Sequence, residues 1–287
     1  LRGKHMETVK TIKEVRQKVR EWRADGLTIG LVPTMGFLHE GHRSLIERAA
    51  AENDRVIVSD FVNPTQFGAG EDLESYPRDI ERDQSVCLAA GADLIFHPKP
   101  EEMYFPDACT AVDMTGDITS ELCGKSRPIH FKGVCTVVSK LFNITTPDRA
   151  YFGQKDAQQL AVIRRMTRDL NFGIEIVGCP IIREEDGLAK SSRNTYLNSQ
   201  ERKAALVLSR AVALGFSMAE NGEKDAEKIL HAMTDLIEQE PLAKIDYVKA
   251  VDASSITPVN EMAGEVLIAM AVYIGSTRLI DNFIYKS

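Results

Sequence analysis

The chain has 287 residues, of which 44% are hydrophobic and 27% charged, and it carries a net charge of -7. This composition indicates an ordinary globular protein with enough apolar residues for a buried core, in one large domain or two. An acidic chain without a basic stripe is not expected to bind nucleic acid, and without an apolar run of ~18 residues or a signal peptide it is expected to be cytoplasmic and to have no membrane partner.

Apolar runs alternate with helical patterns through the first two thirds of the chain. The opening LRGKHM has no such pattern, and we interpret it as a vector remnant before a start at Met6. Strands are predicted at 28–34, 55–62, 93–98, 150–153 and 174–182, and helices at 42–52, 78–91 and 157–170. Short, nearly continuous apolar strands separated by helices predict a parallel sheet with helices on both faces. We therefore expect an α/β, Rossmann-like domain over residues 6–183.

The pattern changes after about residue 183. A long helix is predicted at 198–216, where Asn198 and Glu201 have the spacing of a capping box. A second helix is predicted at 224–240, and strands at 245–252 and 266–275. These elements predict a smaller α+β domain over residues 184–287.

Three polar clusters follow predicted strands of the first domain. They read TMGFLHEGH, FVNPTQF and FGQKD. In parallel sheets, ligands bind beyond the carboxyl ends of the strands. The clusters therefore predict one shared site at this edge of the sheet.

His39 and His42 lie three residues apart, where a helix is predicted to begin. A helix N-terminus has unpaired N–H groups and a partial positive charge, which favour phosphate. Gly41 leaves room for a ligand close to the backbone, and two imidazoles could donate hydrogen bonds to phosphate oxygens. A metal pair would need a third ligand, and none is evident, so no metal site is predicted.

Each of the polar segments has a structural alternative, which for the two histidines is chance spacing or packing. Lys190, Ser191, Ser192 and Arg193 suit a triphosphate, or they form a surface turn. Asp156 and Gln159 have the spacing of an N-cap and N3 pair for a helix whose Leu160, Ile163 and Leu170 face the core. Asn63 and Gln66 can bind a hydroxylated acid, or they belong to a plain loop. The five cysteines, with no CxxC pair, predict reduced thiols and buried small hydrophobes.

The early histidine–glycine–histidine segment and the later Lys-Ser-Ser-Arg loop together resemble the paired phosphate clamp of the HIGH and KMSKS-type nucleotidylyltransferases. Within that superfamily the chain is similar to the pantothenate synthetases (pantoate–β-alanine ligases) from Thr8 to Asn282. The motifs that carry the resemblance are PTMGFLHEGH, FVNPTQF, YPRD, RPIHFKGV, PDRAYFGQKDAQQL, DGLAKSSRN and RLIDN.

The resemblance implies that ATP drives the condensation of pantoate with β-alanine through a pantoyl adenylate, giving pantothenate, AMP and pyrophosphate. ATP would be a substrate and would bring Mg²⁺ with it. The resemblance also implies a homodimer, and a C-terminal domain that moves over the site as a lid.

The same resemblance assigns roles by position. Catalytic roles fall to His42, His39 and Lys155, and Gln66 and Gln159 would bind pantoate. Gln66 and Asn63 would contact β-alanine. The ATP-binding residues would be Met35, Gly36, Phe37, Leu38, His39, Glu40, Gly41, His42, Gly153, Gln154, Lys155, Asp156, Ile182, Lys190, Ser191, Ser192 and Arg193.

Three residues depart from the usual family pattern. Phe37 stands where relatives often have a smaller residue, which affects the shape of that loop. Ile129 replaces the glycine of the usual Arg-Pro-Gly-His-Phe and puts in question the roles of Arg127 and His130. Lys190 stands where many relatives have Met or Leu, so its side chain need not be essential.

Two alternatives stay open at this point. One is another adenylate-forming ligase or nucleotidylyltransferase of the HIGH superfamily. The other is a nucleotide-sensing binding protein without activity, which intact His39, His42, Lys155, Ser191 and Arg193 argue against.

Overall fold

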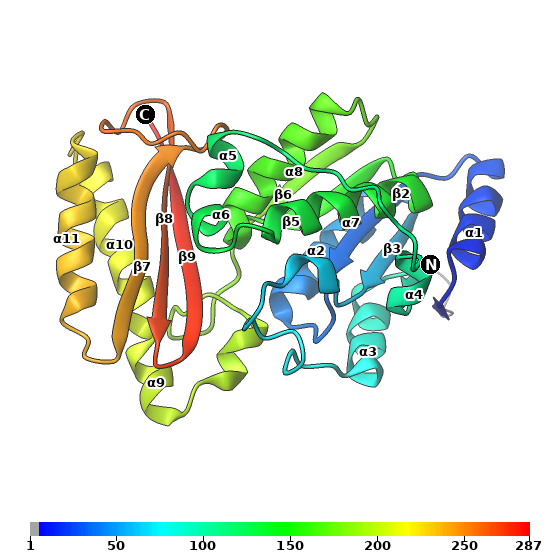
Figure 1. Ribbon diagram of the computed structural model, residues 1–287, viewed down its shortest axis with the longest axis horizontal. Helices are drawn as coiled ribbons and strands as arrows, with labels where there is room; N and C mark the ends of the chain where they lie inside the picture. The colour runs from blue at the N-terminus through cyan, green and yellow to red at the C-terminus, as the bar shows by residue number, and fades with distance from the viewer. Residues whose placement is uncertain (1–5) are drawn as a thin grey trace. The chain divides into compact units, whose positions relative to one another are not determined.

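Nine strands form two separate sheets in residues 6–287, the part of the chain that a computed structural model describes (Figure 1). The first five residues of the segment interpreted as a vector remnant lie outside these described residues. The first sheet has the strand order β1-β4-β3-β2-β5-β6, and every pairing in it is parallel. Its strands are β1 (Glu7–Val9), β2 (Ile29–Thr34), β3 (Arg55–Asp60), β4 (Leu94–Phe96), β5 (Arg149–Gly153) and β6 (Glu175–Cys179).

Helices cover the strands of this sheet. They are α1 (Ile12–Ala24), α2 (Glu40–Glu52), α3 (Ile80–Ala90), α4 (Pro100–Met103), α7 (His130–Thr145) and α8 (Ala157–Asp169). Val32 packs in one core cluster with Ile46 of α2 and Cys87 of α3. Its neighbour Leu31, which points to the opposite face because side chains alternate along a strand, is also fully buried. Helix α7 contacts β2 and packs on α1. The predicted parallel α/β sheet is confirmed.

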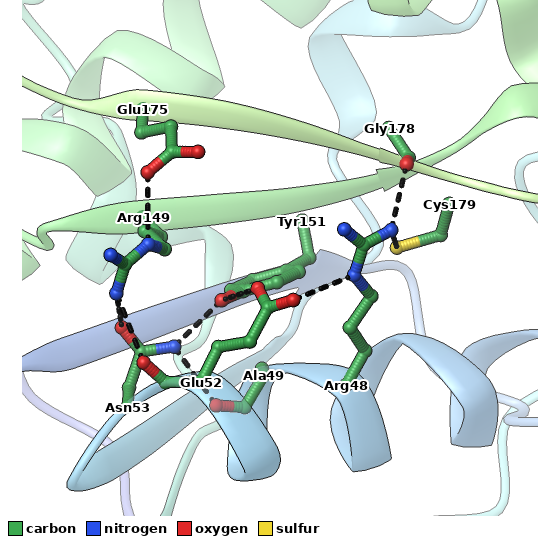
Figure 2. A network of polar contacts seen from close by, with 9 residues as sticks. All are labelled: Arg48, Ala49, Glu52, Asn53, Arg149, Tyr151, Glu175, Gly178 and Cys179. Atoms are coloured by element: carbon green, nitrogen blue, oxygen red, sulfur yellow. Dashed lines mark hydrogen bonds and ion pairs between the residues drawn. The ribbon is translucent and has the colours of Figure 1, made fainter.

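A polar network fixes the C-terminal end of α2 against β5 (Figure 2). Tyr151 is fully buried; its hydroxyl accepts a hydrogen bond from Asn53 Nδ2 at 2.7 Å and donates to Glu52 Oε2 at 2.8 Å. Arg149 Nη1 donates to the Glu52 carbonyl at 2.9 Å, and Arg48 pairs with the Glu52 carboxylate at 3.0 Å. Burial raises the pKa of Tyr151, so the hydroxyl stays protonated and can donate. These contacts place one end of α2 firmly on the sheet.

The second sheet is antiparallel and has the order β7-β8-β9. Its strands are β7 (Ala243–Asp252), β8 (Glu265–Ile274) and β9 (Thr277–Lys286), and its helices are α9 (Ser199–Ala204), α10 (Leu206–Glu220) and α11 (Ala226–Glu238). Helices α10 and α11 lie along this sheet in Figure 1, and alternate residues of β8, such as Val266, Ile268 and Met270, form a core cluster with them. The predicted α+β character of this region is confirmed.

The chain divides into two compact units. One contains the residues up to 114, with 129–154 and 162–180; the other contains 115–128, 155–161 and 181–287. The second unit thus includes the segments 115–128 and 155–161, which a division of the chain at 183/184 would place in the first domain. Its short helix α6 (Cys123–Ser126) contacts β7 through a Ser126 Oγ–Asp246 hydrogen bond of 2.8 Å. Helix α5 (Asp117–Ser120) precedes α6. Among residues 6–287, no helix is both long and apolar enough to cross a membrane.

Two details of the predicted elements were wrong, and one was confirmed. The helix predicted at 198–216 is divided into α9 and α10 at Ala205, where the Leu208 N–H bonds three residues back to the Ala205 carbonyl. Leu170 was expected in the core but is 49% exposed, because α8 ends at Asp169. The capping box of Asn198 and Glu201 is present as predicted.

Candidate active site

Three of the predicted polar segments follow three neighbouring strands. Strands β3, β2 and β5 are adjacent and parallel, so the segments after Asp60, Thr34 and Gly153 leave the same edge of the sheet. The chain order of the strands reverses between β2 and β5. Such a reversal point is where open α/β sheets bind ligands. The predicted convergence of these three strand ends is therefore confirmed.

His39 and His42 form a capping box at the start of α2. His39 is the N-cap, in extended conformation (φ −130°, ψ 179°), and its Nδ1 accepts the Gly41 N–H at 3.1 Å. His42 Nδ1 accepts the His39 N–H at 3.3 Å, and the ring centroids lie 4.1 Å apart. Since both rings accept through Nδ1, the neutral imidazoles carry their proton on Nε2 and can donate from it. The pair thus both caps the helix and provides two imidazole donors at its N-terminus.

The turn before α2 has an unusual backbone. Gly36 (φ +79°) and Phe37 (φ +51°) both adopt left-handed conformations. The guanidinium of Arg82 lies 4.8 Å from the centre of the Phe37 ring. The larger residue at position 37 is therefore accommodated by contact with an arginine of α3.

Gln66 lies in the short 3₁₀ helix η1 (Pro64–Gln66), and Asn63 precedes that helix as its N-cap. Both residues are buried. Asn63 Nδ2 donates to Gln66 Oε1 at 3.1 Å, and Asn63 Oδ1 accepts from Tyr104 Oη at 2.8 Å. Gln66 Nε2 lies 3.0 Å from Met35 Sδ. The structure thus brings Asn63 and Gln66 together with the first residue of the predicted ATP segment.

The departure at Ile129 does not disturb this region. Ile129 precedes α7 with φ −93°, a conformation open to any residue, so no glycine is required. His130 Nδ1 lies 3.1 Å from the Gln66 carbonyl oxygen. Gly133 is needed for close packing, because a Cβ there would lie 2.5 Å from Gln66 Cα. His130 is therefore placed to position Gln66, while Arg127 belongs to the second unit.

The segment after β5 forms the 3₁₀ helix η2 (Gln154–Asp156) and then α8. Lys155 Nζ lies 3.7 Å from Asp156 Oδ2. The backbone carbonyl of Lys155 accepts a hydrogen bond from Asn282 Nδ2 at 2.8 Å. Helix α8 begins directly after Asp156, as predicted, and Gln159 lies in its first turn. The capping roles of Asp156 and Gln159 stay predictions.

The Lys-Ser-Ser-Arg segment follows a tight hairpin in the second unit. Lys190 N donates to the Ile182 carbonyl at 2.9 Å, and Lys190 Nζ pairs with Glu184 at 2.6 Å. Ser191 caps the 3₁₀ helix η3 (Ser192–Tyr196) by accepting the Arg193 N–H at 3.3 Å. The Ile182 carbonyl therefore helps to hold this hairpin.

The hairpin is fixed to β9 by an ion pair. Arg183 contacts the Asp281 carboxylate through both terminal nitrogens, at 2.7 and 2.9 Å, and the Asp281 side chain is 1% exposed. Asp281 and Asn282 are adjacent, so one strand holds both the hairpin and the Lys155 carbonyl. The RLIDN motif contains both residues, but the sequence alone predicted no role for the Asp281 or Asn282 side chain.

Within the described part of the chain, the cysteines and acidic residues do not form a metal site. All five cysteines are free, and Cys87, Cys135 and Cys179 are buried, as expected of small hydrophobes. Burial raises the pKa of Cys179, so it stays a neutral thiol at neutral pH. In residues 6–287, no group of three or more His, Cys, Asp or Glu side chains could hold a metal ion.

Sequence comparison identifies relatives that match over nearly their whole length. The family model of pantoate-beta-alanine ligase matches residues 7–284. The pantothenate synthetase of Clostridium acetobutylicum is 62% identical over 281 residues, covering 98% of this chain and 100% of the relative. That of Enterococcus faecalis is 61% identical, covering 96% of this chain and 98% of the relative.

Solved structures agree with this match. The pantothenate synthetase of Thermus thermophilus is 46% identical and superposes with a TM-score of 0.92, covering 97% of this chain and 99% of that one. The pantoate-beta-alanine ligase of Francisella tularensis, complexed with beta-gamma ATP and beta-alanine, is 34% identical, with a TM-score of 0.80 and 97% of both chains covered. The matched motifs, the fold and these relatives together show that the chain belongs to the pantoate–β-alanine ligase family.

Proposed function

We propose that the chain is an ATP-dependent ligase that condenses pantoate with β-alanine to give pantothenate, AMP and pyrophosphate. The observation that carries the proposal is the histidine capping box at the start of α2, beside the buried pair Asn63 and Gln66 on the adjacent strand end. The histidines supply hydrogen-bond donors for phosphate, and Asn63 and Gln66 supply amide groups for a hydroxylated acid. Family membership supports the choice of substrates.

In the first step, a pantoate carboxylate oxygen attacks the α-phosphorus of ATP. The new P–O bond forms as the bond to pyrophosphate breaks, giving pantoyl adenylate. His39 and His42 donate from Nε2 to phosphate oxygens, where negative charge develops. The other residues of 35–42 hold the nucleotide through the N-terminus of α2. No covalent enzyme intermediate is needed.

In the second step, the neutral amine of β-alanine attacks the acyl carbon. The C–O bond breaks, AMP leaves with that oxygen, and the nitrogen releases a proton to water as the amide forms. A free carboxylate does not accept an amine at neutral pH, so the adenylate provides the leaving group. The protein contributes mainly by orienting the amine and the acyl carbon.

Asn63, Gln66 and Gln159 are the proposed ligands of the two acids. Asn63 donates to the Gln66 side-chain oxygen and Gln66 Nε2 contacts Met35 Sδ, so the side-chain amide has a defined orientation before substrate binds. His130 contacts the Gln66 backbone carbonyl. We assign Gln66 to both pantoate and β-alanine, Gln159 to pantoate and Asn63 to the shape of the β-alanine pocket.

The cationic residues differ in how available they are to phosphate. Lys155 contacts Asp156 only at 3.7 Å, whereas Lys190 is paired with Glu184 at 2.6 Å. Lys155 can therefore turn to a triphosphate at lower cost, and we assign it the catalytic role. Gly153, Gln154, Asp156, Ile182 and Ser191 to Arg193 complete the proposed ATP-binding set, with Lys190 as its least essential member.

Mg²⁺ would reach the protein bound to the ATP phosphates, because phosphate oxygens and water satisfy most of its octahedral coordination. We also propose a Rossmann-like nucleotide-binding domain over 6–183, a lid domain over 184–287, a homodimer and a cytoplasmic location. These proposals rest on the family resemblance.

The test is AMP release, measured with each substrate omitted in turn. The proposal predicts AMP release only with ATP, pantoate and β-alanine together in steady state, and pantothenate in equal amount. Amino-acid-dependent AMP release without pantoate would favour another adenylate-forming ligase. ATP binding without AMP release in the presence of both acids would favour a sensing protein.

A further inference from the structure

Asp83 of α3 binds two consecutive backbone N–H groups of the predicted ATP segment. Its Oδ2 accepts from Phe37 at 2.7 Å and its Oδ1 from Leu38 at 2.6 Å. The residue is 1% exposed, so both bonds are shielded from water. Hydrogen bonds to an ionised carboxylate are about twice as strong as neutral ones. Through these two hydrogen bonds Asp83 therefore holds the backbone of the turn between β2 and α2.

The backbone of this turn has an unusual conformation. Phe37 is a non-glycine residue with φ +51°, a left-handed conformation that is unfavourable for residues with a side chain. A Cβ on Gly36 would collide with Asp60 Oδ1 and lie 3.2 Å from Asp83 Oδ2. Asp60 and Asp83 thus both face this glycine. The backbone at 36–38 is shaped around the two carboxylates.

We propose that Asp83 is a positioning residue for ATP binding: by holding the Phe37 and Leu38 N–H groups it fixes the left-handed turn that places His39 and His42 at the start of α2. The inference rests on the proposed role of residues 35–42 in binding ATP. Asp83 itself touches no substrate in this account.

The charge state of Asp83 is consistent with this role. Burial raises its pKa to about 6, the Leu38 and Phe37 N–H groups oppose that shift, and the nearby charge of Asp60 adds to it. At neutral pH the group is therefore mainly a carboxylate, with both oxygens able to accept. An amide in its place would have one oxygen and one NH₂ group, so one backbone N–H would face a donor.

The test compares Asp83→Asn with Asp79→Ala. Asp79 caps the same helix by accepting the Arg82 N–H at 3.1 Å, so its loss destabilises α3 without removing either Asp83 bond. We expect Asp83→Asn to raise the KM for ATP about tenfold, since one buried N–H loses its acceptor, with the KM for β-alanine within about twofold of wild type. Hydrogen exchange at the Phe37 and Leu38 amides should accelerate to a similar degree. Asp79→Ala should change neither the KM for ATP nor the exchange rates of the Phe37 and Leu38 amides.

Gly36→Ala serves as a second variant, because its methyl group would displace both carboxylates while leaving Asp83 in the chain. It should raise the KM for ATP in the same way, and it keeps the proposal testable if Asp83→Asn does not fold. Unchanged exchange at Phe37 and Leu38 in Asp83→Asn would overturn the inference, as would an equal ATP defect in Asp79→Ala. Faster exchange with an unchanged KM for ATP would also overturn it; if His42→Ala were then fully active, the proposed ATP role of residues 35–42 would fail as well.

Discussion

Replacing His42 by alanine is expected to reduce the rate of pantoate-dependent ATP–pyrophosphate exchange by about 10²–10³-fold, the usual effect of removing one preorganised donor to a developing charge. The reason lies in the capping box. His42 Nδ1 is engaged with the His39 N–H, so the ring acts through Nε2, as a donor. Exchange is measured without β-alanine, so it reports adenylate formation alone.

His42→Gln separates catalysis from helix capping. Glutamine is a standard N3 residue of a capping box and can accept the N-cap N–H as His42 does. It does not place an N–H donor where the imidazole Nε2 lies. We expect His42→Gln to keep thermal stability near wild type and to lose exchange nearly as fully as alanine. Recovery of exchange in His42→Gln would assign His42 to capping only.

The largest expected effect on stability comes from Arg183. Arg183→Leu should lower the free energy of unfolding by about 3–5 kcal/mol, because it leaves the Asp281 carboxylate buried without its cation. That carboxylate is 1% exposed in the intact pair. Denaturant unfolding of the two proteins measures the difference.

Arg202→Leu is the matched control. Arg202 and Arg183 are both 30% exposed, but the partner of Arg202, Asp186, is 44% exposed rather than buried. Loss of that pair should cost about 1 kcal/mol or less. The double variant Arg183→Leu with Asp281→Leu should be more stable than Arg183→Leu alone, since no unpaired charge stays buried. Equal losses in Arg183→Leu and Arg202→Leu would contradict the account.

The parts of the fold that follow from local patterns could be predicted. Apolar strands separated by helices gave the parallel sheet, and the segments after β2, β3 and β5 were expected at one edge, which the strand order confirms. The start of α2 at the histidine pair followed from helix-terminus chemistry. In each case the signal lies within about ten consecutive residues.

The supporting residues could not be predicted, because their partners are distant in sequence. Asp83 accepts from a turn 45 or 46 positions earlier, and Asn282 contacts a carbonyl 127 positions earlier. An aspartate on an amphipathic helix, such as Asp83, reads as a solvated residue until its burial is known. Strand β9, which carries Asp281 and Asn282, was not predicted, because its apolar residues Leu279-Ile280 and Phe283-Ile284 come in adjacent pairs and do not alternate with polar ones. Helix α7 was not predicted either, because the segment RPIHFKGV, in which it begins, was interpreted as a family motif.

The central claim is that pantoate is activated as an acyl adenylate. The direct measurement uses pantoate labelled with ¹⁸O in both carboxylate oxygens, followed by mass spectrometry of the AMP released. Because the attacking oxygen leaves with AMP when the amine breaks the C–O bond, the account predicts one ¹⁸O in each AMP and one in the amide of pantothenate. Unlabelled AMP formed alongside pantothenate would contradict it.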